Sequence, residues 1–373
     1  MRALSRLDTS IIGRWWWTVD RLTLGAFLAL IVIGLVLILA ASPAVASRIG
    51  LDQFFFVRKQ LLFLLPSLAV MFTVSLLPVR GVRRLGALIF VITIALMVLT
   101  LLVGPEIKGA RRWLQMGAFS LQPSEFVKPG FAIVTAWMFA TAARERNFPG
   151  RRIAVALYLM VAGLLVLQPD IGMTLVVSAV WFAQFFLAGL SLVWVGAFSI
   201  LAMAGMILAY TFFPHVAARV DRFLDPSAEN YQIDRAMEAF ANGGLFGTGP
   251  GEGAIKRVLP DAHTDFIFAV AGEEFGLFAG LFIIALFSFI ILRGFSRLYR
   301  EEDFFVMIAA GGLLIQMGLQ AMINIGVNLQ LLPTKGMTLP FISYGGSSTL
   351  SLSLSAGMIL ALTRQRPPGE ESS

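Results

Sequence analysis

The chain has 373 residues, of which 58% are apolar and only 14% are charged. This composition leaves too few polar side chains to cover a soluble globule of that length, so it predicts an integral membrane protein. The formal net charge is +7 and there are no cysteines, which excludes disulfides and thiol chemistry. We expect the positive charge to serve the membrane and an anionic ligand, and we expect no nucleic-acid partner.

Ten apolar runs have about the length that a helix needs to cross roughly 30 Å of hydrocarbon. They predict an all-α integral membrane protein with about ten transmembrane helices. Pro169 and Asp170 interrupt the two short runs between 153 and 188, and a count of nine spans would place the C-terminus on the opposite side. The runs are 22–42, 60–79, 85–104, 124–143, 153–168, 170–188, 191–213, 266–292, 304–326 and 340–363.

The first apolar run follows a 21-residue head, and Ala44-Val45-Ala46 resembles a signal-peptide cleavage site. Because the run has about 20 residues, against about 7–15 in a cleavable signal, we interpret it as an uncleaved first helix. The predicted domains are a cytoplasmic tail (1–21), one polytopic membrane domain (22–363) and a polar cytoplasmic tail (364–373). A large extracytoplasmic loop, about 214–265, is expected between the seventh and eighth helices.

The distribution of Lys and Arg predicts that both termini are cytoplasmic. With the N-terminus inside, sixteen arginines lie in inner segments and twelve Lys or Arg residues lie in outer segments, while Lys128 falls inside the fourth run. An excess of Lys and Arg marks cytoplasmic loops. Two interpretations of the outer cations stay open. The long loop 214–265 crosses regardless of charge, or the nine outer cations from Lys108 onward attract an anionic ligand.

The large loop has two parts with different expected conformations. Residues 230–241 are predicted to form a short surface helix, whereas the glycine-rich stretch 242–251 cannot sustain one. This stretch is not a Walker loop, because no Gly-Lys-Ser/Thr follows it. Its glycines form either plain turns or a close contact with a ligand.

The loop ends in His263-Thr264-Asp265, directly before an apolar run. A charged group at a hydrocarbon boundary costs roughly 2.5 kcal/mol or more on insertion scales, so it needs a partner or a function. We therefore predict that Asp265 is the catalytic residue and that His263 contacts the substrate. Glu273 and Glu274 follow by eight and nine residues, about 12–14 Å along a helix, and are too distant to share in the proton transfer.

Further polar residues stand near the ends of apolar runs. Lys108, Arg111 and Arg112 lie beside Trp113, which suits either a phosphate group or an interfacial anchor. Asp170, between the two short runs, is expected to help shape a polar cavity.

Two more groups are candidates for the wall of that cavity. Glu125 and Lys128 are three apart on one helical face, which predicts either a structural ion pair or a polar cavity wall. Lys335 and Ser343 are predicted to contact the ligand, and they lie in a segment rich in glycine and hydroxyl groups that follows Asn324 and Asn328. Such a segment predicts close helix packing or unwound backbone lining a cavity.

These motifs together resemble the SEDS family of bacterial cell-wall polymerases. The resemblance runs from about 20 to 365, and Lys335-Gly336-Met337-Thr338 is more similar to the cell-division branch than to the elongation branch. One departure is Phe275, where leucine is usual. The segments that carry the resemblance are His263 to Ala269, Glu273 to Gly276, Gln122 to Glu125, Gln168 to Asp170, and Pro340 to Ser348.

The resemblance implies a ten-helix fold in the bacterial inner membrane, with both termini cytoplasmic and a location at the division septum. It also implies peptidoglycan glycosyltransfer from lipid II, with Asp265 as the essential aspartate. A class B penicillin-binding protein, which is a transpeptidase, and division regulators are the implied partners.

A chemical mechanism can be assembled beside this resemblance. Asp265 takes the proton from the 4-hydroxyl of the acceptor sugar as that oxygen attacks the donor's anomeric carbon, which inverts the linkage. Lys108, Arg111, Arg112 and Lys335 are the candidates to meet the charge of the leaving diphosphate. Mg²⁺ or Mn²⁺ is compatible with this chemistry, although the sequence shows no dedicated set of metal ligands.

Three alternatives stay open. A transporter that flips lipid II would also need many helices and charges within the membrane, but its polar residues would be spread through the bilayer, whereas here they lie toward the outer face. An elongation-type polymerase would use the same chemistry. A catalytically silent scaffold would tolerate replacement of Asp265.

Overall fold

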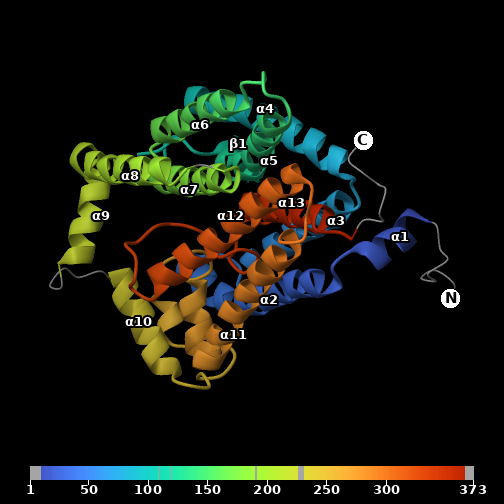
Figure 1. Cartoon of the computed structure of the whole chain (residues 1–373). Helices are drawn as coiled ribbons and strands as arrows, with labels where there is room; N and C mark the ends of the chain where they lie inside the picture. Colours follow the sequence, from blue (N-terminus) through green and yellow to red (C-terminus); the bar gives the residue numbers. More distant parts are fainter. Residues whose placement is uncertain (1–9, 108, 118, 190, 226–230, 366–373) are drawn as a thin grey trace.

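The computed structural model describes residues 10–107, 109–117, 119–189, 191–225 and 231–365, and most of this part is helical (Figure 1). The predicted all-α membrane class is confirmed. One feature was not predicted, a small antiparallel hairpin of β1 (Leu114–Met116) and β2 (Phe119–Leu121). The helices are α1 (Ile11–Thr18), α2 (Arg21–Arg48), α3 (Phe55–Ser75), α4 (Val79–Val103), α5 (Pro123–Arg144), α6 (Gly150–Leu167), α7 (Ile171–Leu187), α8 (Leu192–Phe212), α9 (Pro214–Leu224), α10 (Tyr231–Gly243), α11 (Ile267–Leu298), α12 (Phe304–Asn328) and α13 (Gly346–Leu362), with a 3-10 turn at Ile255–Arg257.

Each predicted apolar run coincides with one of these helices. Within the described residues, eight helices are long and apolar enough to cross a membrane, namely α2, α3, α4, α5, α6, α8, α11 and α12. The helices α7 and α13 are apolar but shorter. The last run begins later than predicted, because the backbone from Pro340 to Gly345 is not helical. Of the two predicted alternatives for this segment, close helix packing or unwound backbone, residues 340–345 adopt unwound backbone.

Three helices form the centre of the bundle. Most residues of α5 and α12 are buried, and nearly every residue of α13 is buried. Small residues permit this close packing, since a methyl group on Gly357 of α13 would lie 2.7 Å from the carbonyl oxygen of Met71 on α3. The ion pair predicted in the fourth run lies here. Lys128 Nζ is 2.9 Å from Glu125 Oε2 and donates to Gln320 Oε1 of α12 at 2.8 Å.

A kink at Gly276 divides α11 into two parts. Its backbone has φ 77° and ψ −175°, and an added methyl group would overlap the backbone of Gly247 and Leu245. Only glycine combines this conformation with so close an approach. The uninterrupted helix that follows, from Leu277 to Leu298, is about 33 Å long at 1.5 Å per residue, which is enough to span the hydrocarbon.

The two glutamates before this kink hold the glycine-rich part of the large loop. Glu273 accepts hydrogen bonds from the backbone of Ile255 (2.7 Å) and Lys256 (3.0 Å), and Glu274 pairs with the buried Lys256 side chain. The predicted surface helix 230–241 is confirmed as α10, and the stretch 242–251 that follows is non-helical except for its first two residues. Glu273 and Glu274 therefore serve the loop, separately from Asp265.

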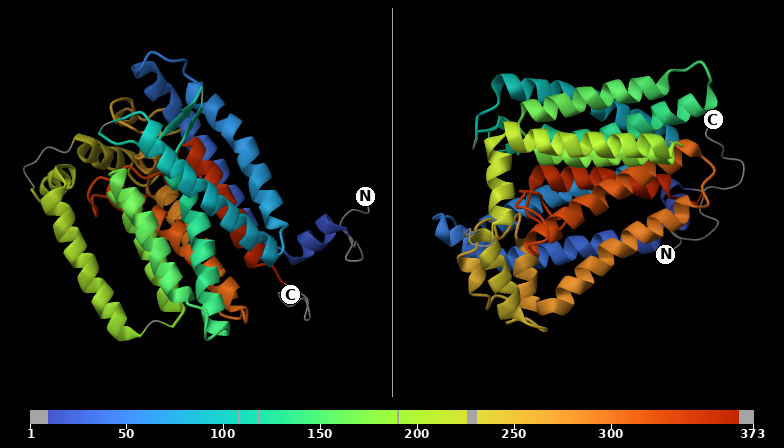
Figure 2. Two further views of the ribbon diagram at one scale, coloured as in Figure 1. Left: turned by 90° about the horizontal axis from the view of Figure 1, so that it is seen from above. Right: turned by 60° about the vertical axis from the view of Figure 1, so that its left-hand side comes forward.

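The bundle has two distinct ends. The short helix α1 and the C-terminal end of α13 lie at one end, and α10 lies at the other (Figure 2). The long helix α8 stands at the side of the bundle, where no described residue of it is buried. It touches α7 through the ring of Phe198, which packs against Trp181 at 5.6 Å.

The buried ion pair yields a test of the packing. We expect Lys128→Met to lower the free energy of unfolding by about 3–5 kcal/mol, because it leaves the Glu125 carboxylate buried without its cation. The double variant Lys128→Met/Glu125→Gln should recover part of this loss. Thermal melting in detergent measures both, and a single variant at least as stable as the double variant would contradict the expectation.

Candidate active site

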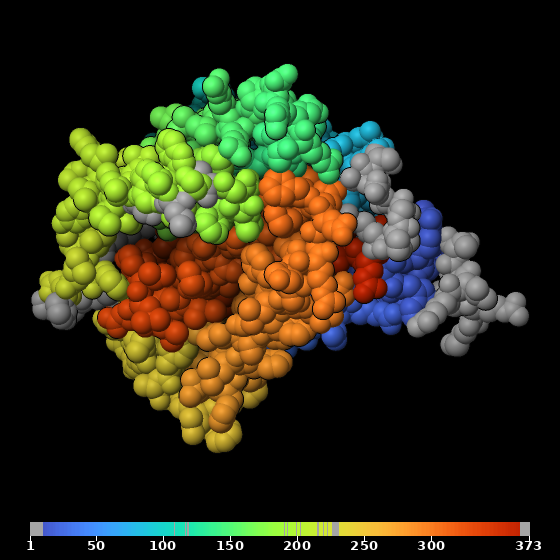
Figure 3. All heavy atoms as spheres, viewed as in Figure 1, coloured from blue at the N-terminus to red at the C-terminus, as the bar shows by residue number. Residues whose placement is uncertain are grey.

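A cleft of about 310 Å³ lies among the start of α7, α9 and the segment after α12. These elements meet at the end of the bundle that carries α10 (Figure 2). Figure 3 shows a hollow in the surface, with α8 and α9 on one side and the segment that follows α12 on the other. Apolar side chains and two cations line it together. The cleft is lined by Arg112, Pro169, Ile171, Gly172, Leu175, Val216, Val220, Ile323, Leu332, Pro333, Thr334, Lys335, Gly336 and Met337.

Asp265 stands just before α11 at the rim of this cleft. A methyl group placed on Gly336 would come within 3.0 Å of Asp265 Oδ2, so the carboxylate lies directly against a residue of the cleft lining. Its backbone carbonyl accepts hydrogen bonds from the side-chain amides of Asn324 and Asn328 of α12, both at 2.9 Å. Two bonds from a well-buried helix fix the position of this residue.

The cations in the cleft gather around one carboxylate. Asp170 begins α7 and caps its N-terminus through a hydrogen bond from Met173 N at 3.3 Å. Its Oδ1 also lies 3.3 Å from Lys335 Nζ and 3.8 Å from Arg112 Nη1. Around Asp170 itself two cations face one carboxylate, so this point of the cleft is positive and suits an anionic group, while the Asp265 carboxylate stands apart at the rim.

Backbone oxygens hold Arg112 in place. Its guanidinium donates from Nε to the carbonyl of Gln168 at 3.1 Å and from Nη2 to the carbonyl of Pro169. Gly172 makes room for the other cation, because a methyl group there would overlap the Lys335 side chain. The break between α6 and α7, predicted from Pro169 and Asp170, is thus where the cations are positioned.

The structure brings four of the predicted site residues to one cleft and leaves the others elsewhere. Asp265, Asp170, Arg112 and Lys335 meet there. Arg111 is exposed, pairs with Glu106 Oε2 at 3.7 Å and is not part of the lining. Lys108 lies outside the described residues. Glu125 and Lys128 form an ion pair within α5, from which Lys128 also donates to Gln320 of α12, and neither lines the cleft.

His263 and Ser343 also lie outside the cleft lining. The Ser343 hydroxyl donates to the carbonyl of Thr264 at 2.6 Å and accepts from Leu339 N at 2.7 Å, so it ties two irregular segments together. The His263 ring is buried, 4.2 Å from the ring of Phe56 between centroids. Burial lowers the pKa of His263 to about 4, so the imidazole is neutral at pH 7.

Several residues of the site were not assigned a role from the sequence. Asn324 and Asn328 were noticed only as polar neighbours, although an amide inside an apolar run is itself a signal of an internal hydrogen bond. Gly172 and Gly336 gave no signal of their own. Val216 and Val220 of α9 reach the cleft through the fold of the large loop, which no local pattern shows.

The donor groups do not make a metal-binding cluster. Among the described residues, no three His, Cys, Asp or Glu side chains gather as ligands for an ion. Asp170 and Asp265 are single carboxylates, each engaged with other groups of the protein. A divalent cation in this cleft would take most of its ligands from a bound phosphate compound, because the described residues alone do not provide a set of ligands.

The fold and the cleft define a class: a multi-pass α-helical membrane protein with a carboxylate and two cations gathered at one end of the bundle. A family model described as "Cell cycle protein", covering FtsW, RodA and SpoVE, matches residues 20–367. The chain belongs to this family.

The chain is similar to several named relatives. It is 47% identical to the probable peptidoglycan glycosyltransferase FtsW of Caulobacter vibrioides, over 98% of this chain and 94% of the relative. It is 34% identical to the protein of the same name from Legionella pneumophila, over 93% and 91%.

Solved structures show the same fold. One belongs to work on the structural coordination of polymerization and crosslinking by a peptidoglycan synthase complex, with a TM-score of 0.76 and 26% identity over 93% of this chain and 98% of that one. Another is the rod shape determining protein RodA of Thermus thermophilus, with a TM-score of 0.67 and 26% identity over 93% and 97%.

The buried His263 predicts how stability depends on pH. Below its ordinary pKa of 6.5 the unfolded chain binds a proton on this imidazole, which the folded chain does not bind until about pH 4. The contribution is therefore complete above pH 6.5 and is lost as the pH falls toward 4. We expect His263→Phe to show a smaller drop in melting temperature than the native protein between pH 7.5 and 5. Equal drops would contradict this assignment.

Proposed function

We propose that the chain is a peptidoglycan glycosyltransferase that polymerises lipid II into glycan strands at the outer face of the cytoplasmic membrane. The observation that carries the proposal is the position of Asp265, against Gly336 at the rim of a cleft that holds Lys335 and Arg112. A base beside paired cations suits a sugar transfer in which the leaving group is a diphosphate. The names of the relatives point to the same activity.

In the proposed reaction, Asp265 accepts the proton of the acceptor's 4-hydroxyl while that oxygen forms a bond to the donor's anomeric carbon. The bond from that carbon to the diphosphate breaks, and the electron pair leaves with the diphosphate. One displacement inverts the configuration, so an α-linked donor gives a β-linkage without a covalent intermediate. General-base catalysis of this kind contributes about 10²–10⁴-fold.

The cleft's cations have a separate role in this scheme. Lys335 and Arg112 stabilise the negative charge on the departing diphosphate, so this group needs no proton. Asp170 is a positioning residue, because it orients both side chains toward one point. A divalent cation would enter with the diphosphate and add charge neutralisation there, and we assign no step to it.

The apolar part of the cleft suits the lipid portion of the substrate. Val216, Val220, Leu175 and Ile323 line the same cleft as the cations. An undecaprenyl chain needs an apolar surface next to the site that binds its diphosphate. The cleft supplies both.

The proposed setting follows the family. Both termini face the cytoplasm, the cleft faces outward, and the enzyme acts at the division septum with a class B penicillin-binding protein and division regulators. The relatives carrying the division protein's name favour this role over elongation. The similarity to a peptidoglycan synthase complex supports a crosslinking partner.

The first test is polymerisation of purified lipid II by the reconstituted protein, its transpeptidase partner and Mg²⁺ or Mn²⁺. We expect Asp265→Ala and Asp265→Asn to lower the rate by at least about 10²-fold while the melting temperature stays close to native, because each removes the base. Full activity in a folded Asp265→Asn protein would overturn the assignment. Lipid II movement across sealed vesicles, without polymer from any protein, would favour a transporter instead.

A second test displaces the base without removing it. Gly336→Ala adds a methyl group 3.0 Å from Asp265 Oδ2, so we expect a roughly tenfold to hundredfold lower rate at unchanged stability. The matched control is Gly163→Ala in α6, where a methyl group meets nothing within 4 Å. An active Gly336→Ala enzyme would mean that the carboxylate position does not govern the reaction.

A further inference from the structure

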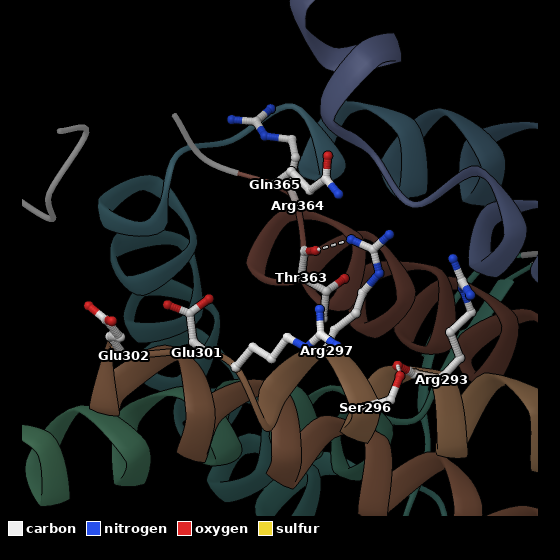
Figure 4. Close-up of a pocket in the computed structure, with 9 residues that line it drawn as sticks. Arg293, Ser296, Arg297, Glu301, Glu302, Thr363, Arg364 and Gln365 are labelled. Atoms are coloured by element: carbon white, nitrogen blue, oxygen red, sulfur yellow. Dashed lines mark hydrogen bonds between the residues drawn. The ribbon is translucent and has the colours of Figure 1, made fainter. Parts of the chain in front are cut away.

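A second and larger cavity, of about 600 Å³, lies at the opposite end of the bundle from Asp265. It lies between the C-terminal end of α11 and the end of α13. It shares no lining residue with the cleft and has no role in the proposed reaction. Its lining residues come from the end of α11, the turn after it and the segment after α13, and Figure 4 shows Arg297 of α11 reaching toward Thr363. Four are arginines, namely Arg293, Arg297, Arg300 and Arg364, and two are the glutamates Glu301 and Glu302.

Two of the arginines are fixed by a buried carboxylate just behind the cavity. Asp20 caps the N-terminus of α2 and accepts from Arg293 Nε at 2.6 Å, while Arg297 Nε lies 2.9 Å from the same oxygen, Oδ2. Arg297 also donates to the carbonyl of Thr363 at 3.1 Å. These bonds hold the two guanidiniums in place, yet one carboxylate cannot neutralise both.

The charges in the cavity are separated in space. The carboxylates of Glu301 and Glu302 lie at one side, and Arg293 lies at the other (Figure 4). Glu301 accepts a hydrogen bond from Asp303 N at 3.2 Å, which fixes its carboxylate at the start of the loop to α12. An anion at the arginine side therefore meets several cations at some distance from the glutamates.

The surface of α11 leading to the cavity is apolar. Phe289 and Leu292 are exposed. Phe289 lies one turn before Arg293, and Leu292 lies one turn before Ser296, so each pair shares one side of the helix. The guanidinium of Arg293 lies 5.9 Å from the centre of the Phe289 ring. This order, apolar side chains followed by arginines, matches acyl chains followed by a phosphate group.

The position of the cavity along α11 matches the level at which lipid headgroups lie. The straight part of α11 is about as long as the hydrocarbon is thick, and the cavity begins within its last two turns. With the termini cytoplasmic, this is the level of the inner leaflet's phosphates, where basic pockets between membrane helices bind anionic lipids.

We propose that this cavity binds the phosphate group of an anionic phospholipid of the inner leaflet. The guanidiniums of Arg300 and Arg364 complete the site that Arg293 and Arg297 begin, because planar donors suit phosphate oxygens. A soluble phosphate would meet the same arginines but would leave the apolar stripe of α11 unused. A lipid bound here touches the ends of both α11 and α13.

The test uses the full-length protein in detergent, with lipid binding followed by native mass spectrometry. The probes are phosphatidylglycerol, phosphatidylcholine and inorganic phosphate. The pocket variant is Arg300→Gln/Arg364→Gln, which keeps both arginines that bind Asp20. The control is Arg80→Gln/Arg84→Gln at the start of α4, which removes the same charge from exposed positions outside the cavity.

We expect phosphatidylglycerol to bind the native protein and the control equally and the pocket variant roughly thirtyfold more weakly, as for two arginines near an anionic headgroup. Phosphatidylcholine should bind more weakly than phosphatidylglycerol to the native protein. Equal phosphatidylglycerol binding by the pocket variant would overturn the proposal. Binding of inorganic phosphate as tight as that of phosphatidylglycerol would also overturn it, because a free phosphate does not use the apolar side chains of α11. Arg300→Gln by itself keeps the test valid should the double variant fold poorly. None of these readouts depends on polymerisation.

Discussion

Irregular backbone inside a membrane protein must find its hydrogen bonds within the protein, and this constraint builds the site. The segment before α11 is not helical, so the carbonyl of Asp265 needs a donor, and two amides of α12 supply it. The neighbouring carbonyls follow the same rule, since Thr264 accepts from Ser343 and His263 accepts from Tyr344 N at 2.9 Å. The hydrogen bonds that satisfy the carbonyls of this non-helical segment also fix the backbone position of Asp265.

The two ends of the bundle use one electrostatic arrangement. At each end a buried aspartate caps a helix and faces two cations from other segments, Asp170 at the cleft and Asp20 at the opposite cavity. The aspartate lowers the repulsion between the two cations, and each group of three charges keeps one positive charge, which at the cleft lies near the Asp265 carboxylate of the rim. An anion then enters a site that is already ordered and does not have to be organised on binding.

The sequence predicted what depends on local pattern. Apolar runs located the helices, and Pro169 with Asp170 located the break where the cations gather. The kink at Gly276, the room that Gly172 gives to Lys335 and the burial of His263 depend on which segments meet in space, which no single sequence shows. His263 and Ser343 were expected at the substrate because polar residues near a membrane boundary suggest function. In the structure the Ser343 hydroxyl joins the two irregular segments, and the His263 ring is buried against Phe56 and Tyr344.

The walls of the cleft differ in how firmly they are held. The charged wall belongs to the start of α7 and the segment after α12, a helix with most of its residues buried. Two of the apolar residues, Val216 and Val220, lie on α9, which follows α8, a helix with no buried residue among those described. Few apolar contacts oppose a shift of such an element, whereas a shift of α12 would disturb the core. The proposed base and the cations near it therefore lie on the rigid side of the cleft, and α9 is the side that can shift at low cost for a bulky lipid-linked substrate.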